Sequence, residues 1–280
     1  MATIGIFDSG LGGLSVLRAI FDILPCEKYL YFADSAHCPY GEKTAEYIQD
    51  RCRTISEGLI REGADIIVVA CNTATAASIA FLRKEYSDVS DPMVRERVLA
   101  LSGGRRDHIM FIGMEPAVKP AALGTRTGKI GVLATAGTLK ASKYLKTKGN
   151  FEDDCEIHEH VGSGFVELVE KGILEGPQAE YTVKESLQPL LDAGADTIVL
   201  GCTHYPFLTD VMKKIAGRGI RFIDPAPAVA RHLVDVMRSE HIALGNAKEN
   251  GSPKRPEIKL MSSGDPKVLE NLFNLIYPRR

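Results

Sequence analysis

Two cysteines in matching surroundings are the residues of this chain best suited to chemistry. Cys71 lies in the stretch GADIIVVACNT and Cys202 in GADTIVLGCTH, so each follows Gly-Ala-Asp and an apolar run and precedes two polar residues. The two thiols are 131 residues apart, 202 minus 71. A free thiol has a pKa of about 8.5, and hydrogen-bond donors or positive charge can lower that value and give a thiolate. Metal ligation, redox chemistry and acid–base catalysis are therefore all open to this pair.

The segments before the cysteines indicate the elements that position them. A short, continuously apolar run predicts a strand buried on both faces, as in a parallel sheet. Ligands of such sheets bind beyond the carboxyl ends of the strands, where both cysteines fall. A second pair of similar segments, at residues 4–10 (IGIFDSG) and 130–137 (IGVLATAG), supports an internal duplication. We expect an α/β fold of two pseudo-symmetric, doubly wound, flavodoxin-like domains whose parallel sheets face a central cleft.

The expected division of the chain gives each domain one cysteine. The first domain would comprise residues 1–94 and 208–280, and the second residues 95–207. Segment 87–108 is rich in charged residues and is interpreted as a possible insertion, a loop or a small helix at a domain edge. Residues 245–256, rich in Gly, Pro and Lys, are expected to form a loop.

Composition narrows the class of protein. The 280 residues are 45% hydrophobic, enough for ordinary globular cores, and the net charge of −2 gives no reason to expect a nucleic-acid or membrane partner. We see no export signal and no apolar run long enough to span a bilayer. The six cysteines lack the spacing of a disulfide framework, so we expect free thiols in a cytoplasmic protein.

Four interpretations of the cysteine pair are open. Cys71, Cys202 and His204 could ligate a metal, but no fourth ligand is evident at a recognisable spacing. The thiols could form a redox pair, although neither belongs to a Cys-x-x-Cys motif. Both could simply be buried thiols at strand ends.

The fourth interpretation is acid–base catalysis. A reaction that removes a proton from one face of a carbon and returns one to the other face needs two groups, and a duplicated fold supplies one thiol from each half. His204 could promote the thiolate of Cys202, and amides at the start of a helix could serve Cys71. Asp8 and Glu170 are available as further proton acceptors or orienting groups.

Two loops carry further candidate residues. Asp8 and Ser9 open a glycine-rich turn between a strand and a helix, whose amides could hold an anion, although helix capping would explain them equally. Pro39, Tyr40 and Gly41 form a turn that could present an aromatic hydroxyl to a substrate, or could be an ordinary turn.

Five motifs together closely resemble the glutamate racemases, members of the cofactor-independent aspartate/glutamate racemase superfamily. The resemblance runs from residue 4 to residue 265, nearly the whole chain, and the last motif points to the glutamate branch in particular. The motifs are DSGLGG at residues 8–13, PYG at 39–41, ACNTA at 70–74, EPAVKP at 115–120 and GCTHYP at 201–206.

The resemblance implies interconversion of L- and D-glutamate, which supplies D-glutamate for peptidoglycan, without pyridoxal phosphate, any other cofactor or a metal. Cys71 would take the proton from D-glutamate and Cys202 from L-glutamate, assisted by Asp8 and His204 with Glu170 nearby. The resemblance also implies a homodimer. The substrate-binding residues that it implies are Asp8, Ser9, Pro39, Tyr40, Gly41, Asn72, Thr73, Thr135, Thr138, Thr203 and His204.

Three features depart from the family pattern. Segment 87–108 is longer than the family usually has, the Cys-Pro often found before Phe165 is missing, and no N-terminal extension precedes the first strand. Some members use such an extension in activation by a cell-wall precursor, so we expect no such regulation here. The alternative functions are an aspartate racemase, against which His204-Tyr205-Pro206 argues, a binding protein that uses the cleft without turnover, and a second role in binding another protein.

Overall fold

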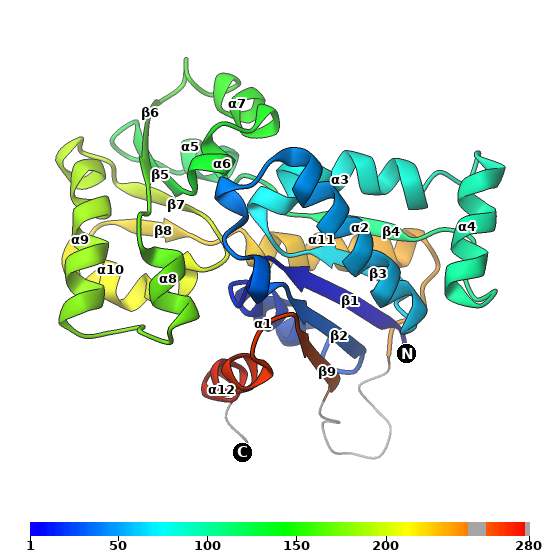
Figure 1. Ribbon diagram of the computed structural model, residues 1–280. Helices are drawn as coiled ribbons and strands as arrows, with labels where there is room; N and C mark the ends of the chain where they lie inside the picture. The colour runs from blue at the N-terminus through cyan, green and yellow to red at the C-terminus, as the bar shows by residue number, and fades with distance from the viewer. Residues whose placement is uncertain (246–255, 278–280) are drawn as a thin grey trace.

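The computed structural model describes residues 1–245 and 256–277 and contains two parallel β-sheets, each flanked by helices (Figure 1). The loop expected at residues 245–256 therefore lies, apart from its two end residues, outside the described residues. The first sheet has the strand order β4-β3-β1-β2-β9 and the second the order β6-β5-β7-β8. The strands are β1 Thr3–Asp8, β2 Lys28–Ala33, β3 Ile66–Val69, β4 Met110–Gly113, β5 Lys129–Ala134, β6 Glu156–Val161, β7 Thr197–Gly201, β8 Arg221–Ile223 and β9 Glu257–Ser262.

The two sheets have the same topology. In each, the first four strands met along the chain lie in the order second, first, third, fourth, and every pairing is parallel. Strand β9 adds a fifth strand to the first sheet, beside β2. This order is the doubly wound, flavodoxin-like one, so the expected pseudo-symmetric fold is confirmed. Such sheets bind ligands where the strand order reverses, which is between β1 and β3 in the first sheet and between β5 and β7 in the second.

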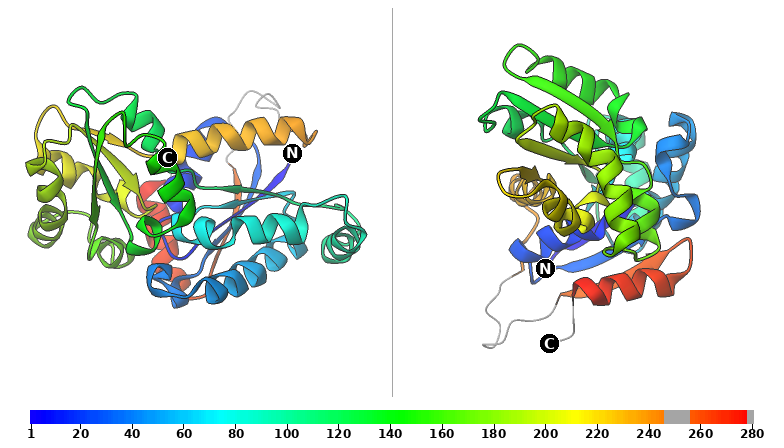
Figure 2. Two further views of the ribbon diagram at one scale, coloured as in Figure 1. Left: turned by 90° about the horizontal axis from the view of Figure 1, so that it is seen from above. Right: turned by 90° about the vertical axis from the view of Figure 1, so that its left-hand side faces the viewer.

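Apolar side chains account for the burial of the central strands. Every residue of β3 and β7 is buried, as expected for strands covered by helices on both faces. Figure 2 shows α11 on one side of the first sheet and α2 and α3 on the other. Ile48, Cys52, Ile55 and Leu59 form the apolar stripe of α2 that packs on this sheet, so Cys52 is a core residue.

The sheets divide the chain at points that differ from the expected boundaries. Strand β4 at residues 110–113 lies in the first sheet, although residues 95–207 were expected to form the second domain. Strand β8 at residues 221–223 lies in the second sheet, although residues 208–280 were assigned to the first domain. Each sheet takes its fourth strand from the segment after its cysteine. The sequence similarity between the two halves ends at Cys71 and Cys202, so it gave no information on where these fourth strands belong.

Segment 87–108 contains the helix α4, which begins after the capping residue Asp91 and is capped at its C-terminus by Gly103 in the left-handed conformation. It lies at the outer edge of the first sheet's helices (Figure 1). The α-helices are α1 Leu14–Ile23, α2 Ala45–Arg61, α3 Asn72–Tyr86, α4 Pro92–Ser102, α5 Val118–Ala122, α6 Ala136–Leu139, α7 Ser142–Gly149, α8 Phe165–Glu170, α9 Pro177–Asp192, α10 Thr209–Ala216, α11 Ala226–Ser239 and α12 Pro266–Ile276. The 3-10 helices are η1 Ser35–His37, η2 Tyr40–Glu42 and η3 Tyr205–Leu208.

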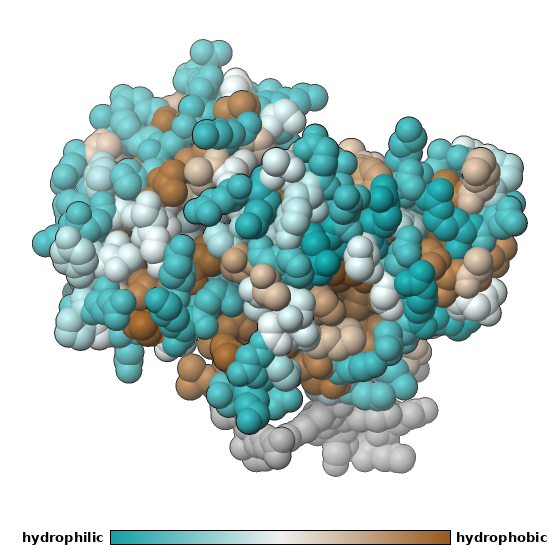
Figure 3. Space-filling model, in the orientation of Figure 1, coloured by the Kyte–Doolittle hydropathy of each residue, from teal (hydrophilic) through white to brown (hydrophobic). Residues whose placement is uncertain are grey.

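Hydrophilic residues predominate on the face shown in Figure 3, with hydrophobic residues interspersed among them. Among the described residues, none of the helices has the length and apolar character needed to cross a bilayer.

Candidate active site

The carboxyl ends of the two sheets border a pocket of about 290 Å³, a volume that includes space open to solvent. Strand ends from both sheets contribute to it, as the reversal of strand order in each sheet predicts. Both Cys71 and Cys202 belong to its wall. The lining residues are Ser9, Pro39, Tyr40, Gly41, Cys71, Asn72, Thr73, Thr135, Val166, Gly201, Cys202, Thr203 and His204.

Cys71 lies between β3 and α3, where its side chain caps the helix. Its Sγ accepts a hydrogen bond from the amide of Ala74 at 3.4 Å, and its thiol donates to Oγ of Ser9 at 3.5 Å. Burial and the negative charge of Asp8 raise the pKa of Cys71 well above its ordinary value, despite these hydrogen bonds. The protonated thiol is therefore the favoured form of Cys71 in the folded chain.

Cys202 follows β7 and lies beside a histidine. Its Sγ is 3.7 Å from Nδ1 of His204, whose Nε2 lies 2.7 Å from Oε1 of Glu170. Burial alone would lower the pKa of His204, but the hydrogen bonds to Cys202 and Glu170 raise it well above its ordinary value. A protonated imidazole beside Cys202 is suited to stabilise a thiolate there.

Asp8 lies behind the pocket wall and does not line it. Its carboxylate accepts hydrogen bonds from the amide of Ser9 at 2.6 Å, from the amide of Gly13, and from the hydroxyl of Thr203 at 3.2 Å. Burial raises the pKa of Asp8, although the positive charge of His204 opposes the change. The carboxyl group thus holds together the loops that follow β1 and β7.

The wall formed by Pro39, Tyr40 and Gly41 is anchored from outside the pocket. The hydroxyl of Tyr40 donates a hydrogen bond of 2.6 Å to Asp34, which is fully buried. Arg51 on α2 holds the same carboxylate through Nε at 2.9 Å and Nη2 at 2.7 Å. Burial would raise the pKa of Asp34, but the Arg51 and Tyr40 hydrogen bonds lower it below its ordinary value. This ionised network fixes the Tyr40 side of the pocket.

Three threonines join the two sheets next to Gly41, where a Cβ added to the glycine would lie 3.6 Å from that of Thr135. Thr73 lies 3.1 Å from Thr135 and 3.5 Å from Thr138, measured between hydroxyl oxygens, and Thr135 and Thr138 are 3.0 Å apart. Thr138 faces a neighbouring pocket and not the one that holds the cysteines. Asn72 borders both pockets, and its buried Nδ2 has no hydrogen-bond partner among the described residues, which leaves a donor free for a ligand.

The structure thus brings most residues singled out in the sequence to one pocket, and leaves three outside its wall. Asp8, Thr138 and Glu170 do not line it, but each is hydrogen-bonded to a residue that does. The sequence reasoning missed Val166 on α8 and Gly201 on β7, which do line it. Gly201 directly precedes Cys202 and was therefore a candidate by position.

The Asp34–Arg51 anchor was missed as well. Nothing in the spacing of Asp34 and Arg51, 17 residues apart on different elements, relates one to the other. The only available signal was the position of Asp34 at the end of an apolar strand, where polar residues of parallel sheets gather around ligands.

Comparison with known proteins gives a consistent result. A family model described as Asp/Glu/hydantoin racemase matches residues 107–233. The glutamate racemase of Stutzerimonas stutzeri is 42% identical over 277 residues, which cover 99% of this chain and 94% of the relative. The crystal structure of a glutamate racemase from Bacillus anthracis superimposes with a TM-score of 0.80 at 29% identity, covering 100% of this chain and 95% of that one. The Escherichia coli glutamate racemase, solved in complex with L-glutamate and the activator UDP-MurNAc-ala, gives a TM-score of 0.78 at 29% identity, with coverages of 98% and 94%.

Proposed function

Because the chain belongs to the glutamate racemase family, we propose that it interconverts L- and D-glutamate by moving the α-proton between two thiols, Cys71 and Cys202. The observation that carries this proposal is that the two cysteines line one pocket from different sheets. A racemase that inverts a carbon centre needs an acid on one face and a base on the other, and two groups held by separate sheets meet that need.

In the direction from L- to D-glutamate, Cys202 is the base. Its thiolate takes the α-proton, and Cys71 gives its own proton to the opposite face of the resulting carbanion. One thiol and one thiolate are present before and after, so the total charge does not change. The raised pKa of Cys71 suits the role of acid in this direction, and the protonated His204 stabilises the thiolate of Cys202. The reverse reaction exchanges the two roles.

His204, Glu170 and Asp8 act through these thiols. Glu170 holds the imidazole of His204 with its Nε2 bound, which leaves Nδ1 directed at Cys202. Asp8 holds Ser9 against Cys71 and Thr203 next to Cys202, so it supports both sides of the reaction. We assign Asp8 this orienting role in place of direct proton transfer, because it has no surface on the pocket.

Neutral donors bind the two carboxylates of glutamate. Among the described residues, the pocket wall contains no lysine or arginine. The hydroxyls of Ser9, Thr73, Thr135 and Thr203 and the free amide of Asn72 are available instead, and Asn72 begins α3, whose N-terminus favours anions. Thr138 orients Thr73 and Thr135 from behind, and Pro39, Tyr40 and Gly41 line the pocket beside Thr135.

The substrate assignment is supported by the Escherichia coli relative, which holds L-glutamate in its solved structure. We further propose that the product D-glutamate serves peptidoglycan synthesis, that the protein acts in the cytoplasm, and that it is a homodimer. These three proposals rest on membership of the family.

A cofactor-free assay tests the proposed function. The purified chain, treated with a chelator and given no added cofactor, is incubated with L-glutamate, and both enantiomers are separated on a chiral column. We expect D-glutamate to accumulate until the two enantiomers are equal in amount, because their free energies are the same. L-aspartate under the same conditions should give far slower conversion. If neither amino acid is racemised, the chain is a binding protein, and if aspartate is the faster substrate, the glutamate assignment is wrong.

A further inference from the structure

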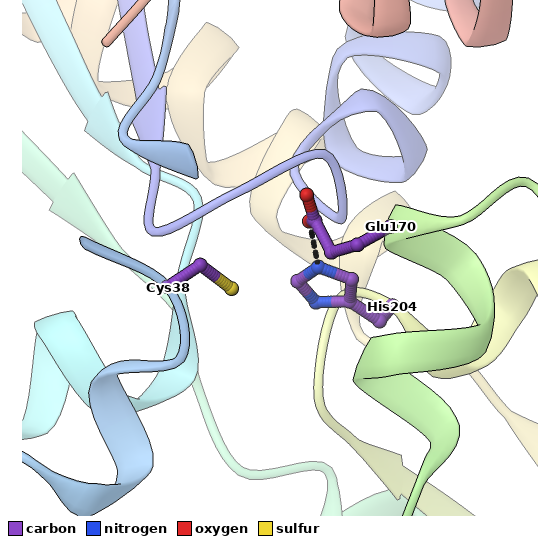
Figure 4. A group of neighbouring side chains, drawn as sticks. All are labelled: Cys38, Glu170 and His204. Atoms are coloured by element: carbon purple, nitrogen blue, oxygen red, sulfur yellow. Dashed lines mark hydrogen bonds and ion pairs between the residues drawn. The ribbon is translucent and has the colours of Figure 1, made fainter. Parts of the chain in front are cut away.

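A second set of potential ligands lies next to the pocket, at the boundary between the two sheets. Cys38, Glu170 and His204 each offer one ligand atom, and these three atoms lie within 4.8 Å of one another. Figure 4 shows the sulfur of Cys38 pointing from the first sheet's loop towards the imidazole of His204 and the carboxylate of Glu170. Cys38 is a free and half-buried thiol, and it has no part in the proton transfer or the substrate binding proposed above.

The three residues come from separate elements. Cys38 lies between η1 and η2, Glu170 ends α8, and His204 follows β7. The carboxylate of Glu170 is already oriented, since Oε1 accepts a hydrogen bond of 2.6 Å from the amide of Leu11 and Oε2 accepts one of 3.5 Å from Ser35. Such outer-sphere hydrogen bonds are a regular feature of carboxylates that ligate metals.

We propose that Cys38, Glu170 and His204 form a binding site for a zinc ion, and that zinc bound there inhibits the enzyme. Thiolate, imidazole and carboxylate are the three side-chain ligands that zinc takes in proteins, and calcium or magnesium would not select the thiol. Zinc–ligand distances of about 2.0 to 2.3 Å require ligand atoms roughly 3.3 to 3.7 Å apart. The present separations, from 2.7 Å for His204 and Glu170 to at most 4.8 Å, reach that range by small side-chain rotations.

Zinc at this site would block the proposed reaction in two ways. It would take a ring nitrogen of His204 and the carboxylate of Glu170, which now hold each other in place beside Cys202. It would also tie the loop carrying Cys38 to Glu170 and His204, and so restrict movement between the loops of the two sheets that border the pocket. The ion is an inhibitor and not a cofactor, and three protein ligands leave a fourth position for water.

Metal binding can be measured without any enzyme activity. The chelator-treated full chain is titrated with Zn²⁺ in competition with a chromophoric chelator, and separately with Co²⁺, whose bond to a thiolate absorbs in the near ultraviolet. We expect one zinc ion bound per chain and a cobalt–thiolate band. Cys38→Ala and Cys38→Ser should both lose the band and bind zinc more than about tenfold more weakly, since loss of even an outer-sphere partner has that effect. Cys26→Ala, which removes another half-buried thiol, should behave as the unaltered chain.

Inhibition is measured with the same variants and rests on the proposed function. Cys38→Ala should keep its racemase activity and tolerate more than about tenfold more zinc, while Cys26→Ala stays sensitive. The proposal is overturned if the unaltered chain binds no zinc, or if Cys38→Ala and Cys38→Ser bind zinc and are inhibited as strongly as the unaltered chain, because the ion then lies on Cys71 or Cys202. A chain that binds zinc through Cys38 but racemises nothing would contradict the proposed function and leave the metal site standing.

Discussion

The hydroxyl of Thr203 donates a hydrogen bond of 3.2 Å to Oδ2 of Asp8, across 195 positions of sequence. Asp8 ends β1 of the first sheet, and Thr203 follows Cys202 at the end of the second sheet. The hydroxyl of Ser15 adds a bond of 2.9 Å to the carbonyl of Thr203. Since Asp8 also holds Ser9, which contacts Cys71, one carboxylate fixes the two cysteine loops relative to each other.

Replacing either cysteine tests the proposed chemistry. We expect Cys71→Ser and Cys202→Ser each to lower kcat/KM by more than about 10²-fold in both directions, because a serine hydroxyl is a far weaker acid and the contribution of a positioned acid–base group is of that size. Cys155→Ser, a buried thiol outside the pocket, is the matched control and should retain activity. Steady-state assays from each enantiomer give the values, and near-normal racemisation by either pocket variant would contradict the two-thiol mechanism.

The anchor of Tyr40 predicts unequal effects of two arginine substitutions on α2. Arg51→Met leaves the fully buried carboxylate of Asp34 without its cation and should destabilise the chain by about 3 kcal/mol. It should also raise KM, because Tyr40 loses the support of this network. Arg53→Met removes a pair with Asp50 in which the side chains are 43% and 74% exposed, and should change stability by less than about 1 kcal/mol. Equal losses in urea unfolding would refute the assigned role of the buried pair.

The side chain of Glu170 leaves no room for a Cβ at Gly10. A Cβ at Gly10 would lie 2.1 Å from Oε1 of Glu170 and 3.1 Å from Sγ of Cys38. Gly10→Ala should therefore push Glu170 away from His204 and reduce kcat with little change in overall structure. Gly58→Ala, in α2 with no atom within 4 Å of the added carbon, should keep full activity and gain about 0.5 to 1 kcal/mol in stability. An active Gly10→Ala variant would show that the Glu170–His204 contact is dispensable.

The raised pKa of Cys71 predicts how stability changes at alkaline pH. The folded chain keeps a proton on Cys71 that the unfolded chain releases above about pH 8.5. This contribution to stability is fully present below that pH and is lost as the pH rises towards the pKa of the folded state. The free energy of unfolding should thus fall by about 1.4 kcal/mol per pH unit for this group.

A comparison of Cys71→Ser with the unaltered chain isolates the pH dependence of stability that Cys71 causes, because the other groups with raised pKa are present in both proteins. Among them is Cys52, for which burial raises the pKa to about 12. Urea unfolding at pH 8, 9 and 10 should show a shallower decline for Cys71→Ser than for the unaltered chain, whereas Cys26→Ser should follow the unaltered chain. Parallel declines for all three proteins would contradict the raised pKa.

Fold class and the pairing of the two halves were predictable because they depend on local patterns. The apolar runs before Cys71 and Cys202 and the similar segments at residues 4–10 and 130–137 indicate strands in the same order. The membership of β4 and β8 was not predictable in this way. Their sequences are short apolar runs like the others, and which sheet they join is decided by packing between distant segments.

The residues of the site show the same difference between what local sequence patterns predict and what packing between distant segments decides. Polar residues within three positions of a strand end, such as Ser9, Asn72 and Thr203, could be placed at the pocket from the sequence. The contacts that Arg51 and Cys38 make behind the pocket wall could not be predicted, because their partners lie on other elements and the contacts form only when the chain folds. Val166 looks in the sequence like any apolar residue of a short helix.

The most direct test of the two-thiol mechanism is the early distribution of deuterium in heavy water. L-Glutamate is supplied, and the reaction is stopped within the first few per cent of conversion. Both enantiomers are then separated, and the deuterium content of each is measured by mass spectrometry. The mechanism predicts that nearly every D-glutamate formed carries an α-deuteron from Cys71, while the remaining L-glutamate is unlabelled, and that the reverse holds from D-glutamate. If the substrate's own proton appears in the product, or if recovered substrate and product are labelled equally, one group serves both faces and the two-thiol mechanism is contradicted.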